Sequence, residues 1–326
     1  MDFSRSLADD LCFFFGIRQQ PERLIVGTGR AMAHHGEILQ GVFCDKGERL
    51  HRGLITLPCP AFEAVATFWP DDRNNIRTRP VGMLKAARAA QLTLEMLGQP
   101  DAGGSLTIES NIPMSLGYGS STADVVAAIR AISAAMRVEL SRATICRLAV
   151  AAETASDSIV FGPQAVLFAQ REGHVIEYLP GEYPPLLIVG FVSTNDASVD
   201  TLTFRPARYD RSEIESFRVL RGLARKAILE QDAGLLGRVA TASARINQRY
   251  LPKENLAELL ALADNCGALG VQIAHSGNRM GLLIDARHPD ASNQSDVAAK
   301  AAATQGFINI HQFAVNVDVR GLKGQL

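Results

Sequence analysis

Cysteine is scarce in this sequence, and the few cysteines form neither a metal nor a disulfide pattern. Five cysteines are scattered over 326 residues, with no Cys-x-x-Cys pair among them. A disulfide scaffold needs a dense and even set of cysteines, and a zinc site built from thiolates needs them at short spacing. We therefore expect reduced and mostly packed thiols, as in a cytosolic protein.

Long apolar runs and an excess of positive charge are also missing. The longest early apolar run covers only residues 11–17, and Asp9 and Asp10 precede it where a signal peptide would be basic. No run approaches the roughly 20 apolar residues of a membrane-spanning helix. Lys and Arg total 33 against 34 Asp and Glu, so a net charge of −1 leaves no overall positive field. We expect a soluble cytoplasmic protein without a nucleic-acid or membrane partner.

The order of predicted elements indicates an α+β protein of two domains. A chain of 326 residues exceeds the usual size of about 100–200 residues per domain. Strands are predicted at 23–26, 61–69, 105–109, 165–168, 186–192, 271–274, 281–285 and 313–319. Helices are predicted at 83–97, 122–136, 141–153, 212–230, 235–250 and 255–269. Prolines and a glycine crowd together at 180–185, which favours a domain boundary there.

The most informative segment is 111–124, NIPMSLGYGSSTAD, between a predicted strand and an apolar helix. Gly117 and Gly119 let the backbone turn tightly and approach a ligand closely. Ser120–Thr122 would begin the helix, whose unpaired N–H groups and dipole favour phosphate binding. Hydroxyl oxygens at this position also suit Mg²⁺. From the residues alone, a strand-to-helix loop capped by Ser or Thr is an equal alternative.

This segment has neither the Gly-Lys-Ser/Thr of a Walker loop nor the glycine spacing of a dinucleotide fingerprint. Its pattern Pro-x-x-x-Gly-x-Gly-Ser-Ser-x-Ala, residues 113–123, resembles the nucleotide-binding motif of the GHMP kinases. The usual family form is Gly-Leu-Gly-Ser-Ser-Ala, and this chain has Tyr118 and Thr122 instead. The resemblance implies that ATP contacts Pro113, Leu116, Gly117, Tyr118, Gly119, Ser120, Ser121 and Thr122.

Two further segments resemble family motifs in the expected order. Segment 27–43, GTGRAMAHHGEILQGVF, has Gly-Arg followed by Gly-Glu, which in the family line the phosphoacceptor site, with one extra residue between them. Its Gly-Glu-Ile-Leu-Gln-Gly run is similar to the L-threonine kinase branch of cobalamin biosynthesis, as is the His-Ser-Gly at 275–277 within LGVQIAHSGNRMGLLID. The resemblance spans residues 24–320. It implies acceptor contacts from His35, Glu37, Gln40, Ser276 and Gly277.

The resemblance also implies the catalytic groups. In segment 151–168 it places a catalytic base at Asp157 and a Mg²⁺ ligand at Glu153, with Ser121 as the second ligand. It further implies that Arg30 is a cation beside the base. Phosphoryl transfer to a hydroxyl needs positioning and charge neutralisation, and a carboxylate can orient the hydroxyl or accept its proton. Without the resemblance, Asp157 would be interpreted as a turn cap and Glu153 as a solvated side chain.

Weaker candidates complete the set. The adjacent residues His34 and His35 lack a third metal ligand at a useful spacing, so a place at the acceptor pocket is favoured over a metal site. His275 is expected to anchor its loop. Thr194 and Asp196 follow a predicted strand where acceptor loops of such enzymes lie.

The resemblance implies a GHMP kinase fold. A ribosomal-protein-S5-like N-terminal domain would cover residues 20–182, and a ferredoxin-like C-terminal domain would cover 183–326, with the active site between them. The expected reaction uses ATP and Mg²⁺ to phosphorylate a small-molecule hydroxyl group, first of all L-threonine to O-phospho-L-threonine. Three alternatives stay open: another hydroxy amino acid or small alcohol, an ATP-dependent decarboxylase, and an inactive ligand sensor. A homodimer is also left open.

Overall fold

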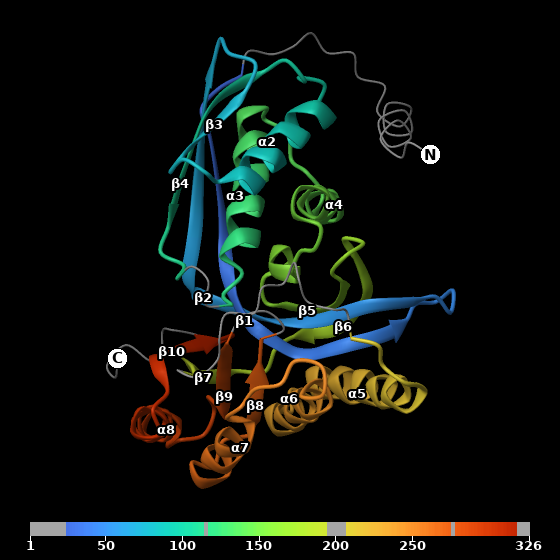
Figure 1. The fold of residues 1–326 in the computed structure, drawn as a ribbon, viewed down its shortest axis with the longest axis vertical. Coiled ribbons are helices and arrows are strands. Elements are labelled where there is room, and N and C mark those ends of the chain that lie inside the picture. Colours follow the sequence, from blue (N-terminus) through green and yellow to red (C-terminus); the bar gives the residue numbers. More distant parts are fainter. Residues whose placement is uncertain (1–23, 114–116, 194–206, 275–277, 318–326) are drawn as a thin grey trace.

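The structure is a computed structural model that describes residues 24–113, 117–193, 207–274 and 278–317. It is elongated, with one group of helices at each end of a curved sheet (Figure 1). Helices α2, α3 and α4 lie in the N-terminal half, and α5, α6, α7 and α8 lie in the C-terminal half. None of the helices in these ranges is long and apolar enough to cross a membrane.

Ten strands of the described residues form one sheet in the order β10-β7-β9-β8-β1-β2-β4-β3, with β5 pairing β2 and β6. The neighbouring strands are antiparallel except for β3 and β4. The strands are β1 (Gly27–Cys44), β2 (Leu50–Asp71), β3 (Ile76–Arg79), β4 (Gly103–Ser110), β5 (Gln164–Ala169), β6 (His174–Glu182), β7 (Leu186–Val192), β8 (Gly270–Ile273), β9 (Arg279–Asp285) and β10 (Ile308–Val315). The helices are α2 (Leu84–Met96), α3 (Ser120–Ala135), α4 (Arg142–Glu153), the short 3-10 helix η1 (Ser158–Phe161), α5 (Arg211–Glu230), α6 (Ala233–Asn247), α7 (Leu256–Asn265) and α8 (Ala291–Thr304).

Strand β1 is much longer than the predicted strand at 23–26 and contains the whole motif segment 27–43. Its first two glycines, Gly27 and Gly29, are packing positions rather than breaks, because α3 lies directly against them. A Cβ atom on Gly27 would lie 2.2 Å from the carbonyl oxygen of Ala131, and one on Gly29 would lie 2.2 Å from that of Ala127. The glycines therefore let α3 approach β1 closely, which brings the start of α3 to the middle of the strand.

The predicted helices from α2 to α7 are confirmed within a few residues, although α7 ends at Asn265 rather than near 269. Helix α3 is buried on most sides, as its Ala- and Ile-rich sequence predicts. Helix α8 and strands β3 and β6 were not predicted. The sequence of α8, ASNQSDVAAKAAAT, has only small apolar side chains, so its buried face gives a weak helical pattern.

The hydrophobic core has two clusters, and the larger one crosses the middle of the molecule. It joins α3 and the strands around β1 to Phe217 of α5 and Leu236 of α6. The smaller cluster lies between β7–β9 and α7 and α8. The predicted boundary at 182–183 falls between the end of β6 and the start of β7. That boundary stays a prediction, and the shared cluster shows that the two halves pack closely.

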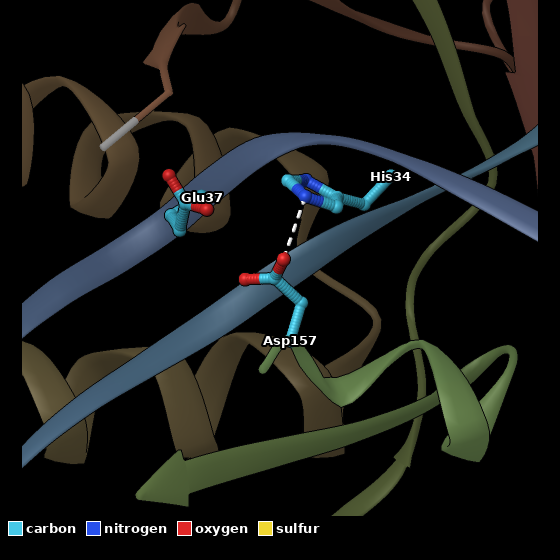
Figure 2. Close-up of side chains that lie close together, drawn as sticks. All are labelled: His34, Glu37 and Asp157. Atoms are coloured by element: carbon cyan, nitrogen blue, oxygen red, sulfur yellow. Dashed lines mark ion pairs between the residues drawn. The ribbon is translucent and has the colours of Figure 1, made fainter. Parts of the chain in front are cut away.

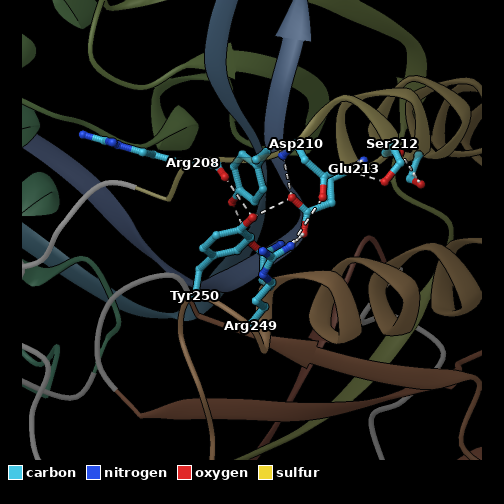
Figure 3. A network of polar contacts seen from close by, with 9 residues as sticks. Arg208, Asp210, Ser212, Glu213, Arg249 and Tyr250 are labelled. Carbon is cyan, nitrogen blue, oxygen red and sulfur yellow. Dashed lines mark hydrogen bonds and ion pairs between the residues drawn. The ribbon is translucent and has the colours of Figure 1, made fainter.

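A polar network fixes where α5 begins (Figure 3). Asp210 caps the helix by accepting the backbone N–H of Glu213, and Glu213 accepts the N–H of Asp210 in return. From the C-terminal end of α6, the guanidinium of Arg249 lies 3.3 Å from the Glu213 carboxylate, and Tyr250 donates its hydroxyl to the same side chain. The capping box and these contacts hold the ends of α5 and α6 together.

Candidate active site

The loop before α3 is shaped for a ligand that approaches the backbone. Gly119 is the N-cap of α3 and has φ +66°, in the left-handed region that favours glycine. A Cβ atom there would lie 2.1 Å from Cδ2 of His34. No side chain caps the helix start, so its first N–H groups are directed to the space beside the loop.

Two hydroxyl groups in the first turn of α3 bind the carboxylate that ends α4. Ser121 donates to Oε2 of Glu153 at 3.0 Å, and Thr122 donates to Oε1 at 2.9 Å. The Thr122 hydroxyl also lies 3.4 Å from Oδ2 of Asp157. Helix α4 ends here because Thr154 takes a left-handed conformation, which turns the chain back toward α3. The alternative of a solvated Glu153 is wrong, because this side chain is buried.

Burial makes Glu153 an unusual carboxyl group. Burial raises its pKa to about 7, and the charge of Asp157 adds to the effect, while the hydrogen bonds from Thr122 and Ser121 oppose it. Nearby on α3, burial alone raises the pKa of Asp124 to about 6. A divalent cation beside Glu153 would restore its charged form, so the donor set of hydroxyl and carboxylate oxygens fits Mg²⁺.

Asp157 is directed into the same place from the start of η1. It occupies the N-cap position but makes no capping bond with its side chain, so the turn-cap alternative is wrong. Its Oδ2 atom lies 2.9 Å from Nε2 of His34, and both side chains are buried (Figure 2). The backbone N–H of Gly36 donates to Nδ1 of the same ring at 3.1 Å. Because Nδ1 accepts this bond, we assign the ring proton to Nε2, the nitrogen nearer to Asp157.

The cation expected beside Asp157 is not Arg30. The side chain of Arg30 is 64% exposed and pairs with Glu63 at 2.8 Å on the surface. Even-numbered residues of β1 face outward as far as Met32, whereas His34 is buried. A register shift separates Met32 from Ala33, and the extra residues there, 60–62, belong to β2. The expectation for Arg30 is corrected in this respect: His34 lies beside the carboxylate instead.

His34, Glu37 and Asp157 form a cluster with ligand atoms within 4.8 Å of one another. The interpretation that the histidines lack a third metal ligand at a useful spacing is wrong for His34, because Glu37 lies three residues further on and folding brings Asp157 to the same place. The ring proton on Nε2, however, occupies the lone pair that a metal ion would need. Ser121 and Glu153 offer only oxygen atoms, the donors that Mg²⁺ prefers.

The family assignment follows from two matching family models. Residues 84–170 match the GHMP kinases N terminal domain, and residues 224–303 match the GHMP kinases C terminal domain, together just over half of the chain. The chain belongs to the GHMP kinases. As a member of this family it is an ATP-dependent phosphotransferase that acts on a hydroxyl group.

Relatives of this GHMP kinase share about the same level of identity. It is 29% identical over 207 residues to an L-threonine kinase of Salmonella typhimurium (strain LT2), over 63% of this chain and 67% of the relative. It is also 29% identical over 211 residues to a homoserine kinase of Moorella thermoacetica, over 63% and 70%. The crystal structure of homoserine kinase from Cytophaga hutchinsonii has a TM-score of 0.67 at 17% identity, over 92% of this chain and 97% of that chain. The predicted α+β GHMP kinase fold is confirmed.

The predicted acceptor residues of the GHMP kinase divide into three groups. Glu37 is buried at the point where β1 pairs with both β2 and β8, beside Asp157. Gln40 is half-buried, and its backbone is held by Ser243 and Asn247 of α6. The acceptor candidates Thr194, Asp196, Ser276 and Gly277 lie outside the described residues, as do Leu116, predicted to contact ATP, and His275, expected to anchor its loop.

His35, another predicted acceptor contact, packs between strands of the GHMP kinase sheet. Its Nδ1 atom lies 2.7 Å from Oε1 of Gln272, and the ring fills space that Cβ atoms on Gly190 and Gly281 would occupy. Burial, with nearby Arg279, holds the pKa of His35 well below its usual value, so the ring is neutral. The structure therefore places His35 between β1, β7, β8 and β9.

Tyr118, where the family usually has leucine, is directed away from the helix start. The side chain is buried, with the guanidinium of Arg279 3.7 Å from the ring centroid and the hydroxyl 2.7 Å from Nε2 of His311. Pro113 is half-buried at the start of the loop. Arg279 and His311 were not predicted from the sequence; the tyrosine in place of leucine was the signal that another partner exists.

Proposed function

We propose that this GHMP kinase transfers the terminal phosphoryl group of ATP to the hydroxyl group of L-threonine, giving O-phospho-L-threonine. The observation that carries the kinase site is the chain of contacts at the start of α3. Ser121 and Thr122 bind Glu153, and Thr122 and His34 flank Asp157. The choice of L-threonine is supported by the similarity to L-threonine kinases and by the run at 36–41.

The proposed nucleotide site is the loop before α3. The phosphates of ATP would bind the backbone N–H groups of Gly117–Thr122, with Gly119 leaving room for close approach. Ser121 and Glu153 would hold Mg²⁺ through oxygen atoms. The ion would neutralise charge on the phosphate oxygens.

The proposed acceptor site contains two carboxylates, those of Asp157 and Glu37. Asp157 would accept a hydrogen bond from the acceptor hydroxyl, orient that oxygen toward the phosphoryl group and take its proton. Glu37, buried 4.8 Å or less from the Asp157 group, would bind the ammonium group of an amino acid, and Gln40 would bind a polar neighbour. An amino acid that carries a hydroxyl group satisfies both carboxylates.

A second candidate acceptor is L-homoserine. The favouring observation is the equal identity of 29% to the homoserine kinase of Moorella thermoacetica. Homoserine carries the same ammonium group, and its hydroxyl group lies one carbon further from it. Both candidates would therefore contact the same residues, and they differ only in the distance between the hydroxyl group and the ammonium group.

An acceptor screen tests the proposal. ADP release and formation of a phosphate ester would be followed with ATP, Mg²⁺ and each of L-threonine, L-homoserine, L-serine and simple amino alcohols. We expect the largest kcat/KM for L-threonine. Preference for another alcohol would keep the kinase and exclude the threonine assignment. ATP binding without turnover of any acceptor would favour the inactive ligand sensor.

A further inference from the structure

The backbone and the ring of His34 are held from three directions. Its backbone N–H donates to the carbonyl of Tyr118 at 3.1 Å, and the N–H of Gly36 donates to its Nδ1 atom at 3.1 Å. The ring packs against Gly119 so closely that no Cβ fits there. The exposed fraction of the whole residue is 0%. A single side chain thus contacts the phosphate loop, the Gly36 turn and Asp157.

These contacts select one form of the ring. A charged imidazolium would carry a proton on Nδ1, which would face the N–H of Gly36, so two donors would oppose each other. The neutral ring with its proton on Nε2 satisfies Gly36 and places the Nε2 atom 2.9 Å from Oδ2 of Asp157. An arginine or lysine beside the carboxylate would bring a permanent positive charge, whereas this histidine brings a dipole only.

We propose that His34 is a positioning residue for Asp157, acting through the neutral ring with its proton on Nε2. This inference rests on the proposed function, in which Asp157 orients the acceptor hydroxyl. Thr122 lies 3.4 Å from the same Oδ2 atom of Asp157. His34 and Thr122 therefore hold one oxygen of the Asp157 carboxylate between them.

Two substitutions separate positioning from packing. His34→Gln keeps an N–H donor at about the reach of Nε2, and His34→Met keeps the bulk without a donor. We expect His34→Met to lower kcat by about 10²-fold, because a misplaced catalytic group costs about that much, and to leave the KM for ATP unchanged. We expect His34→Gln to restore kcat to within about 5-fold of the wild type, as a positioning donor should.

A double substitution tests whether His34 acts through Asp157. In the background of Asp157→Asn, His34→Met should cause no further loss of kcat, because residues that act as a unit are not additive. His51→Met is the matched control: His51 is also buried, lies 3.0 Å from an aspartate oxygen, that of Asp45, and pairs with Phe43 at the hairpin end of β1 and β2. It should leave kcat unchanged.

Equal loss of kcat in His34→Met and His34→Gln, additive losses in the double variant, or wild-type kcat in His34→Met would each overturn the inference. The ring form has a readout that needs neither activity nor folding of a variant. Nitrogen NMR of histidine-labelled wild-type protein should show His34 as the neutral ring protonated on Nε2, and a charged or Nδ1-protonated ring would contradict the inference. Absence of turnover with every acceptor would instead reject the proposed function. The NMR experiment would still test the form of the His34 ring independently.

Discussion

The hydroxyl of Tyr118 lies 2.7 Å from Nε2 of His311 and joins the loop before α3 to β10 in the C-terminal half. Burial raises the pKa of Tyr118 above its usual value and lowers the pKa of His311 to about 4. The tyrosine is therefore a neutral phenol and the histidine a neutral ring, and a hydrogen bond joins the hydroxyl group to the ring. Arg279, whose pKa burial lowers to about 10, stays charged over the tyrosine ring.

Removal of the Tyr118 hydroxyl should loosen this connection. We expect Tyr118→Phe to lower the free energy of unfolding by about 1–2 kcal/mol, because a buried histidine nitrogen loses its partner. We also expect the KM for ATP to rise, because the loop that carries Gly119 loses an anchor. Thermal unfolding and steady-state kinetics would measure both effects. Tyr178→Phe is the control, since Tyr178 is 61% exposed on β6; equal behaviour of the two variants would contradict the prediction.

Gly119 should tolerate no side chain. Gly119→Val places a Cβ atom against the ring of His34 and forces a β-branched residue into a left-handed conformation. We expect loss of ATP binding in calorimetric titration. Gly82→Val is the matched control, because Gly82 has φ +97° but meets nothing within 4 Å. It should show the cost of the backbone strain, about 1–2 kcal/mol, and keep ATP binding. Unchanged ATP affinity in folded Gly119→Val would remove the loop from the phosphate site.

Local patterns in the sequence predicted the helices and the Ser-Ser start of α3, because both depend on neighbouring residues. The family order of motifs placed Ser121 and Glu153 as partners, and the structure brings them together. The contact between His34 and Asp157 joins positions far apart in the chain, so no local period encodes it. It also lies next to a register shift between β1 and β2, which changes the pairing of the two strands.

The acceptor assignment predicts a difference between two ligands. Glu37→Ala and Gln40→Ala should raise the KM for the amino acid more than the KM for ATP, because Glu37 would bind the ammonium group and Gln40 a polar neighbour. The effect should be larger for Glu37, which is buried beside Asp157, than for half-buried Gln40. Kinetics with each substrate varied in turn would show this. Loss of ATP affinity with an unchanged KM for the acceptor would assign the segment to the nucleotide.

The raised pKa of Glu153 predicts that the metal-free protein loses stability as the pH rises. The folded protein holds this proton up to a pKa of about 7, while the ordinary pKa of a glutamate in an unfolded chain is about 4.5. Between these values the folded state binds more protons, so stability is greatest below about 4.5 and falls until about 7, by about 3 kcal/mol.

Denaturant unfolding of the wild type and Glu153→Gln in the presence of EDTA would measure this contribution. The glutamine cannot ionise, so the fall in stability between about pH 4 and 8 should be smaller in the variant by the stated amount. Mg²⁺ should also stabilise the wild type more at pH 8 than at pH 6, because it binds the ionised carboxylate. Identical pH profiles for the two proteins would show that Glu153 is ionised throughout.

Asp157→Asn should lower kcat by about 10²–10⁴, the range for a positioned general base. The two side chains have nearly the same shape, so packing against His34 and Thr122 should persist and ATP should still bind. Circular dichroism would confirm folding, and Asp45→Asn supplies a control in another pair of aspartate and histidine. A loss of only a few-fold would mean that the phosphate loop and the metal ligands carry the rate by positioning alone. In that case the contact with His34 would serve to hold η1 against β1, and the base would have to be water or a phosphate oxygen.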